Sequence, residues 1–264
     1  MWIRIGPPPL PREHGAWAML LTPPIVAMIA QGIHPDAVLA MIGWFAAYSM
    51  RGPVEVLIGR GASGRAGMAQ AERPVARFWL LLLGGLTALL LGLAALAQPV
   101  VLLLLTGAGA LLGAVWRLAW QGESRSLAAG FLAVTGLMAG APLYYLTALG
   151  TIPPEGWALT YGCFAFFGGS VLRVKALARE RRSAAFRWLS LTVHLLLVLV
   201  AAGAAWRGWT SPLLAVALLP AGAWAAYGAW RGGRGTPVNL GSVGKAEIWL
   251  TLLFALLLIL SVRI

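Results

Sequence analysis

The chain has 264 residues, of which 60% are hydrophobic and only 11% are charged, and it carries a formal net charge of +12. This composition excludes a single water-soluble globule. The only cysteine, Cys163, excludes an internal disulfide and any metal site built from several cysteines. We therefore predict an all-α membrane protein in which residues 1–264 form a single polytopic membrane domain.

Apolar runs of about 20 residues, separated by prolines, glycines and charges, predict nine transmembrane helices in one bundle. In chain order they cover residues 15–32, 36–58, 75–97, 99–120, 127–149, 157–178, 186–206, 211–230 and 246–262. The first 15 residues contain charges and prolines but no apolar core followed by a cleavage site. We therefore expect the first span to be retained as an anchor rather than removed as a signal peptide.

The distribution of basic residues supports this count, because Lys and Arg concentrate in cytoplasmic loops. With nine spans and a cytoplasmic N-terminus, 18 of the 20 basic residues lie on the cytoplasmic side, and the exceptions are Arg207 and Arg263. The C-terminus then lies on the opposite side. The positive charge reflects topology and contact with anionic lipid, so we expect membrane lipids as partners and no nucleic acid.

The first span opens with the stretch PREHGAWAMLLTPP, which places Glu13 and His14 at its cytoplasmic mouth. Pro23 and Pro24 interrupt the backbone hydrogen bonding further in, which favours a bend and a cavity. Histidine titrates near neutral pH, so His14 is a candidate for proton transfer. The alternative is a histidine that only packs between helices.

The second span ends in AYSMRGPVEVLIGR, which places Arg51 and Glu55 four residues apart on one helix face with Pro53 between them. One interpretation is an ion pair that neutralises itself at a kinked helix end. The other is that Arg51 binds an anionic headgroup, because a guanidinium matches phosphate or carboxylate geometry, with Glu55 as a candidate base.

Two further polar clusters follow the fourth and sixth spans. The turn WRLAWQGESRSLAAG contains Arg117, Glu123 and Arg125, and a serine there is expected to cap the next helix. The sixth span ends with Arg173 and Lys175, and Arg173 lies just inside the hydrocarbon boundary, where an arginine needs an anion or a carboxylate.

All of these groups fall on the cytoplasmic side, so a single polar chamber opening to that side is geometrically possible. Its candidate members are the catalytic residues His14 and Glu55 and the substrate-binding residues Arg51, Arg117, Glu123, Arg125, Arg173 and Lys175. Another histidine, His194, is isolated within the seventh span, where a hydrogen-bonded core residue is favoured over a ligand. Two small-residue pairs, Gly109 with Gly113 and Gly136 with Gly140, indicate close helix packing.

The stretch EHGAWAMLLTPP resembles the opening signature of the YwiC-like bacterial integral membrane proteins. Further similar stretches are RSLAAG, APLYYL, VLRVKALARERR and GSVGKAEI, so the resemblance covers most of the chain. Its most specific part runs from His14 to Trp17, and Trp17 therefore joins the candidate substrate-binding residues. A bacterial inner, or cytoplasmic, membrane location is implied.

Nine spans with polar clusters after the second and sixth also resemble the UbiA superfamily of membrane prenyltransferases. Those enzymes hold Mg²⁺ and an isoprenoid diphosphate with aspartate-rich motifs at these two places. Here the only aspartate is Asp36, on the predicted opposite side. The residues that remain cannot supply the oxygen ligands that Mg²⁺ needs. We therefore expect neither a metal nor a cofactor, while a UbiA-like architecture remains possible.

Three classes of function stay open at this point. The first is a cytoplasm-facing cavity that binds an anionic or isoprenoid-type lipid, with or without a divergent transferase or lipid-modifying activity. The second is a permease for small solutes, and the third is a non-enzymatic scaffold or assembly factor. The missing charges at mid-depth argue against the permease, because transporter sites usually lie there.

Overall fold

The computed structural model describes residues 6–11, 14–58, 66–123, 126–180, 182–233 and 239–263, and the side chains at 14, 66–71, 119, 232–233 and 240 lie outside that description. Within these ranges every regular element is a helix, which confirms the predicted all-α class. The helices are α1 (His14–Gln31), α2 (Pro35–Ser49), α3 (Arg51–Leu57), α4 (Ala66–Ala97), α5 (Val100–Trp120), α6 (Leu127–Met138), α7 (Gly140–Leu149), α8 (Pro154–Ala178), α9 (Ala184–Trp206), α10 (Pro212–Gly233) and α11 (Leu240–Arg263).

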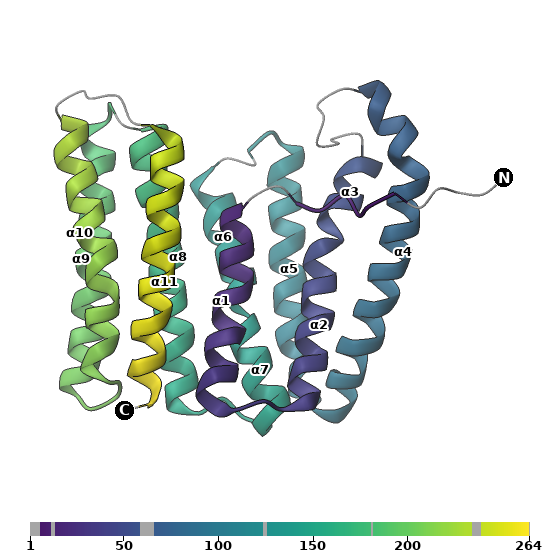
Figure 1. Ribbon diagram of the computed structural model, residues 1–264, viewed down its shortest axis with the longest axis horizontal. Helices are drawn as coiled ribbons and strands as arrows, with labels where there is room; N and C mark the ends of the chain where they lie inside the picture. Colours follow the sequence, from purple (N-terminus) through teal and green to yellow (C-terminus); the bar gives the residue numbers. More distant parts are fainter. Residues whose placement is uncertain are drawn as a thin grey trace.

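The helices stand side by side, and their direction alternates along the chain except within the pairs α2/α3 and α6/α7 (Figure 1). The first turn of α1 lies at the upper end of the bundle in this view, and the C-terminus lies at the lower end. Short turns at residues 32–34, 98–99, 150–153 and 207–211 connect helices at the lower end. The upper end corresponds to the side that the basic residues predict to be cytoplasmic.

Two of the predicted spans are kinked rods, each made of two helices that a single residue separates. Met50 lies between α2 and α3, and Ala139 lies between α6 and α7. Pro53 and Pro142 follow three residues later and have no N–H group to donate to the carbonyls one turn back, which explains both breaks. Over the described residues, the eleven helices therefore form nine rods that match the nine predicted spans.

Six of these rods are long and apolar enough to cross a membrane by length and composition: α4, α5, α6/α7, α9, α10 and α11. The other three are α1, α2/α3 and α8. Of these, α8 is the most enclosed, since it packs against α1, α6, α7, α9, α10 and α11. An enclosed helix can carry polar groups that a lipid-facing helix cannot. The chain is a multi-pass membrane protein.

Glycines and aromatic rings set the spacing around α8. The ring of Phe166 stacks on Phe254 of α11 with centroids 4.2 Å apart. A Cβ on Gly162 would lie 2.8 Å from the end of the Leu214 side chain of α10, so a larger residue here would have to displace that leucine. The close helix packing predicted at Gly140 is confirmed, because Pro24 of α1 packs directly against this glycine. The prediction for Gly109 and Gly113 is wrong, because that face of α5 is open.

Residues 6–11 form a proline-rich strap across α3 and α4. The indole of Trp79 donates a hydrogen bond to the Gly6 carbonyl at 2.9 Å, and the indole of Trp17 donates to the Pro11 carbonyl at 3.1 Å. A Cβ on Gly52 would lie 1.5 Å from the Pro9 carbonyl oxygen. The strap therefore occupies the space that a side chain at position 52 would need.

Candidate functional site

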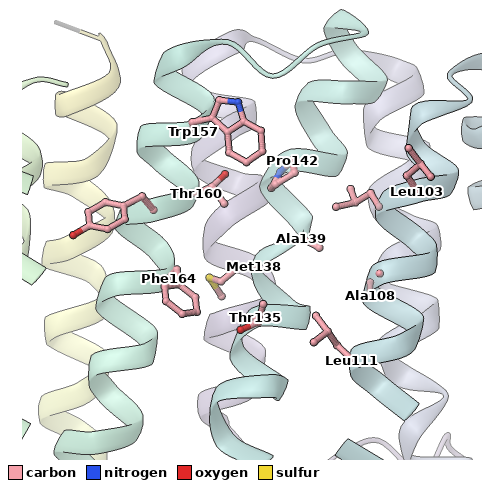
Figure 2. Close-up of a pocket in the computed structure, with 13 residues that line it drawn as sticks. Leu103, Ala108, Leu111, Thr135, Met138, Ala139, Pro142, Trp157, Thr160 and Phe164 are labelled. Carbon is pink, nitrogen blue, oxygen red and sulfur yellow. The ribbon is translucent and has the colours of Figure 1, made fainter. Parts of the chain in front are cut away.

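A groove of ≈ 650 Å³ opens between α5, the kinked α6/α7 rod and α8. Figure 2 shows α5 residues on one side, α8 residues on the other, and the kink at Ala139 and Pro142 between them. Its volume lies within the range of small-molecule sites, about 300–1,000 Å³. The lining residues are Leu103, Leu104, Gly107, Ala108, Leu111, Thr135, Met138, Ala139, Pro142, Trp157, Thr160, Tyr161 and Phe164.

The hydroxyl groups in this lining already donate to backbone carbonyls. Thr135 donates to Phe131 and Thr160 donates to Gly156, each at 2.8 Å, while Tyr161 donates to Leu197 of α9 at 2.9 Å. These hydroxyl protons are therefore not available to a ligand. The remaining lining is aliphatic, aromatic or thioether, so the groove offers an apolar surface.

Small residues and the kink create this space. A Cβ on Gly107 would meet no atom within 4 Å, so α5 presents a gap there rather than a ridge. Across the groove, the break at Ala139 turns the α6/α7 rod at the level where Met138 and Pro142 line the wall. The groove thus exists because a helix break faces a small-residue stretch.

The predicted polar residues lie elsewhere, toward the upper end. Arg51 and Glu55 form the expected ion pair, with Nε 2.8 Å from Oε1 and with 30% and 37% of the side chains exposed. A role for either residue in binding or catalysis stays a prediction. Trp17 packs edge-on against Tyr48 at 5.1 Å between ring centroids, so α1 and α2 meet next to this pair.

The other upper-end candidates do not join that pair in the described residues. Arg117 and Glu123 are exposed at and beyond the end of α5. Lys175 lies with Nζ 5.8 Å from the centre of the Phe186 ring, on the far side of α8. The side chain of His14 and the whole of Arg125 lie outside the described residues. The predicted serine cap is present, since Ser126 accepts a hydrogen bond from Ala129 N.

Arg173 is enclosed in the bundle at the upper part of α8 and pairs with Glu247 of α11. Its Nε donates to Glu247 Oε1 at 2.9 Å and its Nη2 donates to Oε2 at 2.6 Å. The Ser170 hydroxyl also donates to that carboxylate at 3.3 Å. The arginine is 1% exposed and the carboxylate 17%. The prediction that Arg173 requires an anion or a carboxylate is thus met within the chain.

His194 of α9 completes this cluster. Its Nδ1 lies 2.7 Å from the Ser190 carbonyl, which can only accept, so Nδ1 carries the proton. Its Nε2 is then free to accept from Arg173 Nη1 at 2.9 Å. The ring is therefore a neutral, fully hydrogen-bonded histidine, as its isolated position in an apolar span favoured. Gly169 makes room for it, because a Cβ there would lie 2.8 Å from Nε2.

The cluster of Arg173, Glu247 and His194 includes one residue that sequence reasoning missed. Glu247 lies inside the predicted span 246–262. An acidic residue within a membrane span indicates a buried partner for its charge, and this was the signal in the sequence. The separation of 74 residues between Arg173 and Glu247 hid the pairing. No group of three potential metal ligands occurs in the described part of the chain.

Comparison with known proteins identifies the family. The sequence model of the YwiC-like protein family matches residues 10–145, which is just over half of the 264 residues. The chain belongs to the YwiC-like family. This match covers α1 to α7 up to Tyr145, including two of the three walls of the groove.

One curated relative agrees with this membership. The chain is 26% identical to "Uncharacterized protein YwiC" of Bacillus subtilis (strain 168) over 199 residues, which covers 75% of this chain and 79% of the relative. No solved structure matches the chain. The resemblance to the UbiA superfamily stays a prediction, while membership of the YwiC-like family is confirmed.

Proposed function

We propose that this YwiC-like protein binds the hydrocarbon chain of a membrane lipid in the groove between α5, α6/α7 and α8. The observation that carries the proposal is the apolar lining of a groove of ≈ 650 Å³ whose hydroxyl donors are already used within the chain. An apolar surface of this size among membrane helices suits an isoprenoid or long acyl chain.

Chain direction supports an orientation for this lipid. The groove residues of α5 and α8 lie between the start and about the middle of those helices, which begin at the lower end of the bundle. We propose that the upper end faces the cytoplasm of a bacterial cell, as the basic residues indicate. The groove then lies at the middle of the membrane and in the half away from the cytoplasm. Its lipid enters from that part of the membrane and not through a cytoplasm-facing cavity.

The same lining argues against the permease alternative at this groove. A small polar solute needs donors and acceptors along its path, and the described lining is mostly hydrocarbon, with hydroxyls already bonded to backbone and the indole of Trp157 as its other polar side chain. A transferase reaction at His14 and Glu55 stays a prediction.

A single substitution pair on α5 tests the proposal. Gly107 lines the groove and Gly109 does not, and a Cβ added to either glycine would meet no other atom within 4 Å. Gly107→Trp fills the groove without a clash at its Cβ, whereas Gly109→Trp adds the same side chain to the open face of the same helix. Both variants should insert and fold.

The measurement is native mass spectrometry of gently purified protein, together with labelling by a photoreactive isoprenyl alcohol and a photoreactive fatty acid. We expect co-purified lipid and labelling of the Met138 region in the parent protein and in Gly109→Trp, with at least a tenfold loss in Gly107→Trp. Equal lipid content and equal labelling in the two variants contradict the proposal. The probe that labels more strongly assigns the chain class.

A further inference from the structure

The groove between α5, α6/α7 and α8 offers hydrogen-bond acceptors to a ligand. The hydroxyls of Thr135 and Thr160 give their protons to backbone carbonyls one turn back, each at 2.8 Å. A hydroxyl oxygen that has donated its proton keeps its lone pairs and can still accept a hydrogen bond. Both threonines line the groove, so each adds one acceptor to it.

The kink adds a backbone acceptor to this set. Pro142 has no N–H group, so the carbonyl of Met138 lacks the donor that a regular helix supplies one turn later. Met138 and Pro142 both line the groove, so the opened turn of the α6/α7 rod lies on the groove face. Figure 2 shows Thr160 on the α8 side of the groove, at the level of Pro142 on the kinked rod.

Donors are scarce in the same lining. The hydroxyl of Tyr161 donates to Leu197 of α9, and no residue of α9 is among the described lining residues, so this proton is used outside the groove. The indole N–H of Trp157 is the remaining side-chain donor of the described lining, and it lies near the start of α8 at the lower end. A ligand that supplies a proton therefore matches the groove better than a ligand that only accepts one.

The charges of the wall helices point to the same class of ligand. None of the described lining residues is charged. On α5 to α8, the charged residues nearest to the lining are Glu155, two residues before Trp157, and Arg117, six residues after Leu111. The acidic residue thus lies at the lower mouth of the groove, and the basic one lies toward the upper end.

The basic residues at the lower end are engaged elsewhere. The turns at residues 98–99 and 150–153 contain no Lys or Arg. The guanidinium of Arg207 lies over the Trp209 ring, and Arg263 donates to the Ile29 carbonyl of α1 at 2.7 Å. Neither arginine lines the groove. An anionic headgroup would therefore leave water without a cation to pair with, which is costly.

We propose that the groove binds a neutral lipid alcohol, with its hydroxyl at the kink and its chain along Leu111 and Phe164. This inference rests on the proposed function and names the headgroup class of the lipid. The hydroxyl donates to the Met138 carbonyl, and the two threonine oxygens are neighbouring acceptors. A backbone carbonyl without a partner is costly inside a membrane, so this bond favours the alcohol over an ether with the same chain.

Three probes that share one isoprenoid chain test the headgroup: the free alcohol, its methyl ether and its monophosphate. Each probe competes with the photoreactive isoprenyl alcohol for the protein in nanodiscs of neutral lipid, and its concentration is counted in the bilayer. We expect the alcohol to bind about threefold to tenfold more tightly than the ether, which is the usual effect of one neutral hydrogen bond. The monophosphate should bind at least tenfold more weakly than the alcohol.

A variant with Thr135→Val, Thr160→Val and Pro142→Ala removes the acceptor set. Valine copies the shape of threonine without its oxygen, and alanine supplies the missing N–H group to Met138. The alcohol and the ether should then bind about equally. Thr106→Val on α5 is the matched control, because Thr106 also donates to the carbonyl one turn back at 2.8 Å but does not line the groove. This control should keep the preference of the parent protein.

The outcomes separate this inference from the proposed function. Equal binding of the three probes, or tighter binding of the monophosphate, leaves the groove proposal standing and overturns the preference for an alcohol. If none of the probes binds the parent protein, both proposals are overturned. A preference for the alcohol that persists in Gly107→Trp, which fills the groove, places the hydroxyl elsewhere and also overturns the inference.

The variant without the acceptor set gives a further decision. A preference for the alcohol that is unchanged in this variant overturns the inference. If the variant does not give a monodisperse protein, the three probes are compared in the parent protein, in Thr106→Val and in Gly107→Trp. The preference must then be present in the first two proteins and absent from the third.

Discussion

Gly169→Ala should loosen the contact between α8 and α9 by displacing His194. The added Cβ would lie 2.8 Å from Nε2 and 3.3 Å from both neighbouring ring carbons, whereas ordinary contacts begin near 3.4 Å. The ring must therefore move by about 0.6 Å away from α8. It is held by Ser190 on one side and by Arg173 on the other, so this movement stretches both hydrogen bonds.

The expected loss of stability follows from these contacts. A hydrogen bond to a charged group contributes about 1.5–3 kcal/mol, and alanine recovers up to about 1 kcal/mol over glycine through its helix preference. We expect a net loss of about 1–2 kcal/mol in the free energy of unfolding. At about 2–4 °C per kcal/mol for a chain of this size class, the melting temperature should fall by roughly 2–8 °C.

The assay is the temperature at which half of the purified protein leaves the monodisperse peak in size-exclusion chromatography. Gly203→Ala on α9 is the matched control, because a Cβ there meets no atom within 4 Å and the change in helix preference is the same. Gly168→Ala, the next residue on α8, meets Phe131 at an ordinary 3.4 Å. If Gly169→Ala melts at the same temperature as these two variants, the argument from ring displacement is refuted.

Two further predictions concern the strap and the topology. Gly52→Ala should displace the strap from α3, since the added Cβ would lie 1.5 Å from the Pro9 carbonyl oxygen. We expect a prolyl endopeptidase to cleave residues 6–11 faster in this variant than in the control Gly85→Ala. Equal cleavage rates in the two variants contradict this prediction. In a Cys163→Ala background, cysteines at Glu123 and Gly208 should react with a membrane-impermeant thiol reagent from opposite sides of the membrane. Nine crossings require this result, whereas six crossings by the most apolar rods alone place both residues on the same side.

The sequence by itself determined the helices and their order, because hydropathy and helix breakers act locally. The predicted span 127–149 coincides with Leu127–Leu149, the combined range of α6 and α7. The main difference is α4, predicted to begin at 75 but starting at Ala66. Hydropathy reports the apolar stretch of a helix, whereas hydrogen bonding continues through polar residues, so the helix extends beyond the span.

Only the tertiary structure decided which side chains meet. The charge of Arg173 predicted that it needs an anion, but its partner Glu247 is 74 residues away, and no local pattern encodes that distance. The groove also depends on the tertiary structure. Gly107 and Gly109 are both glycines within the same apolar helix, but only Gly107 lines the groove and faces the kink at Ala139. A helix specifies its own faces through its periodicity, but the neighbour that each face receives depends on packing across the whole bundle.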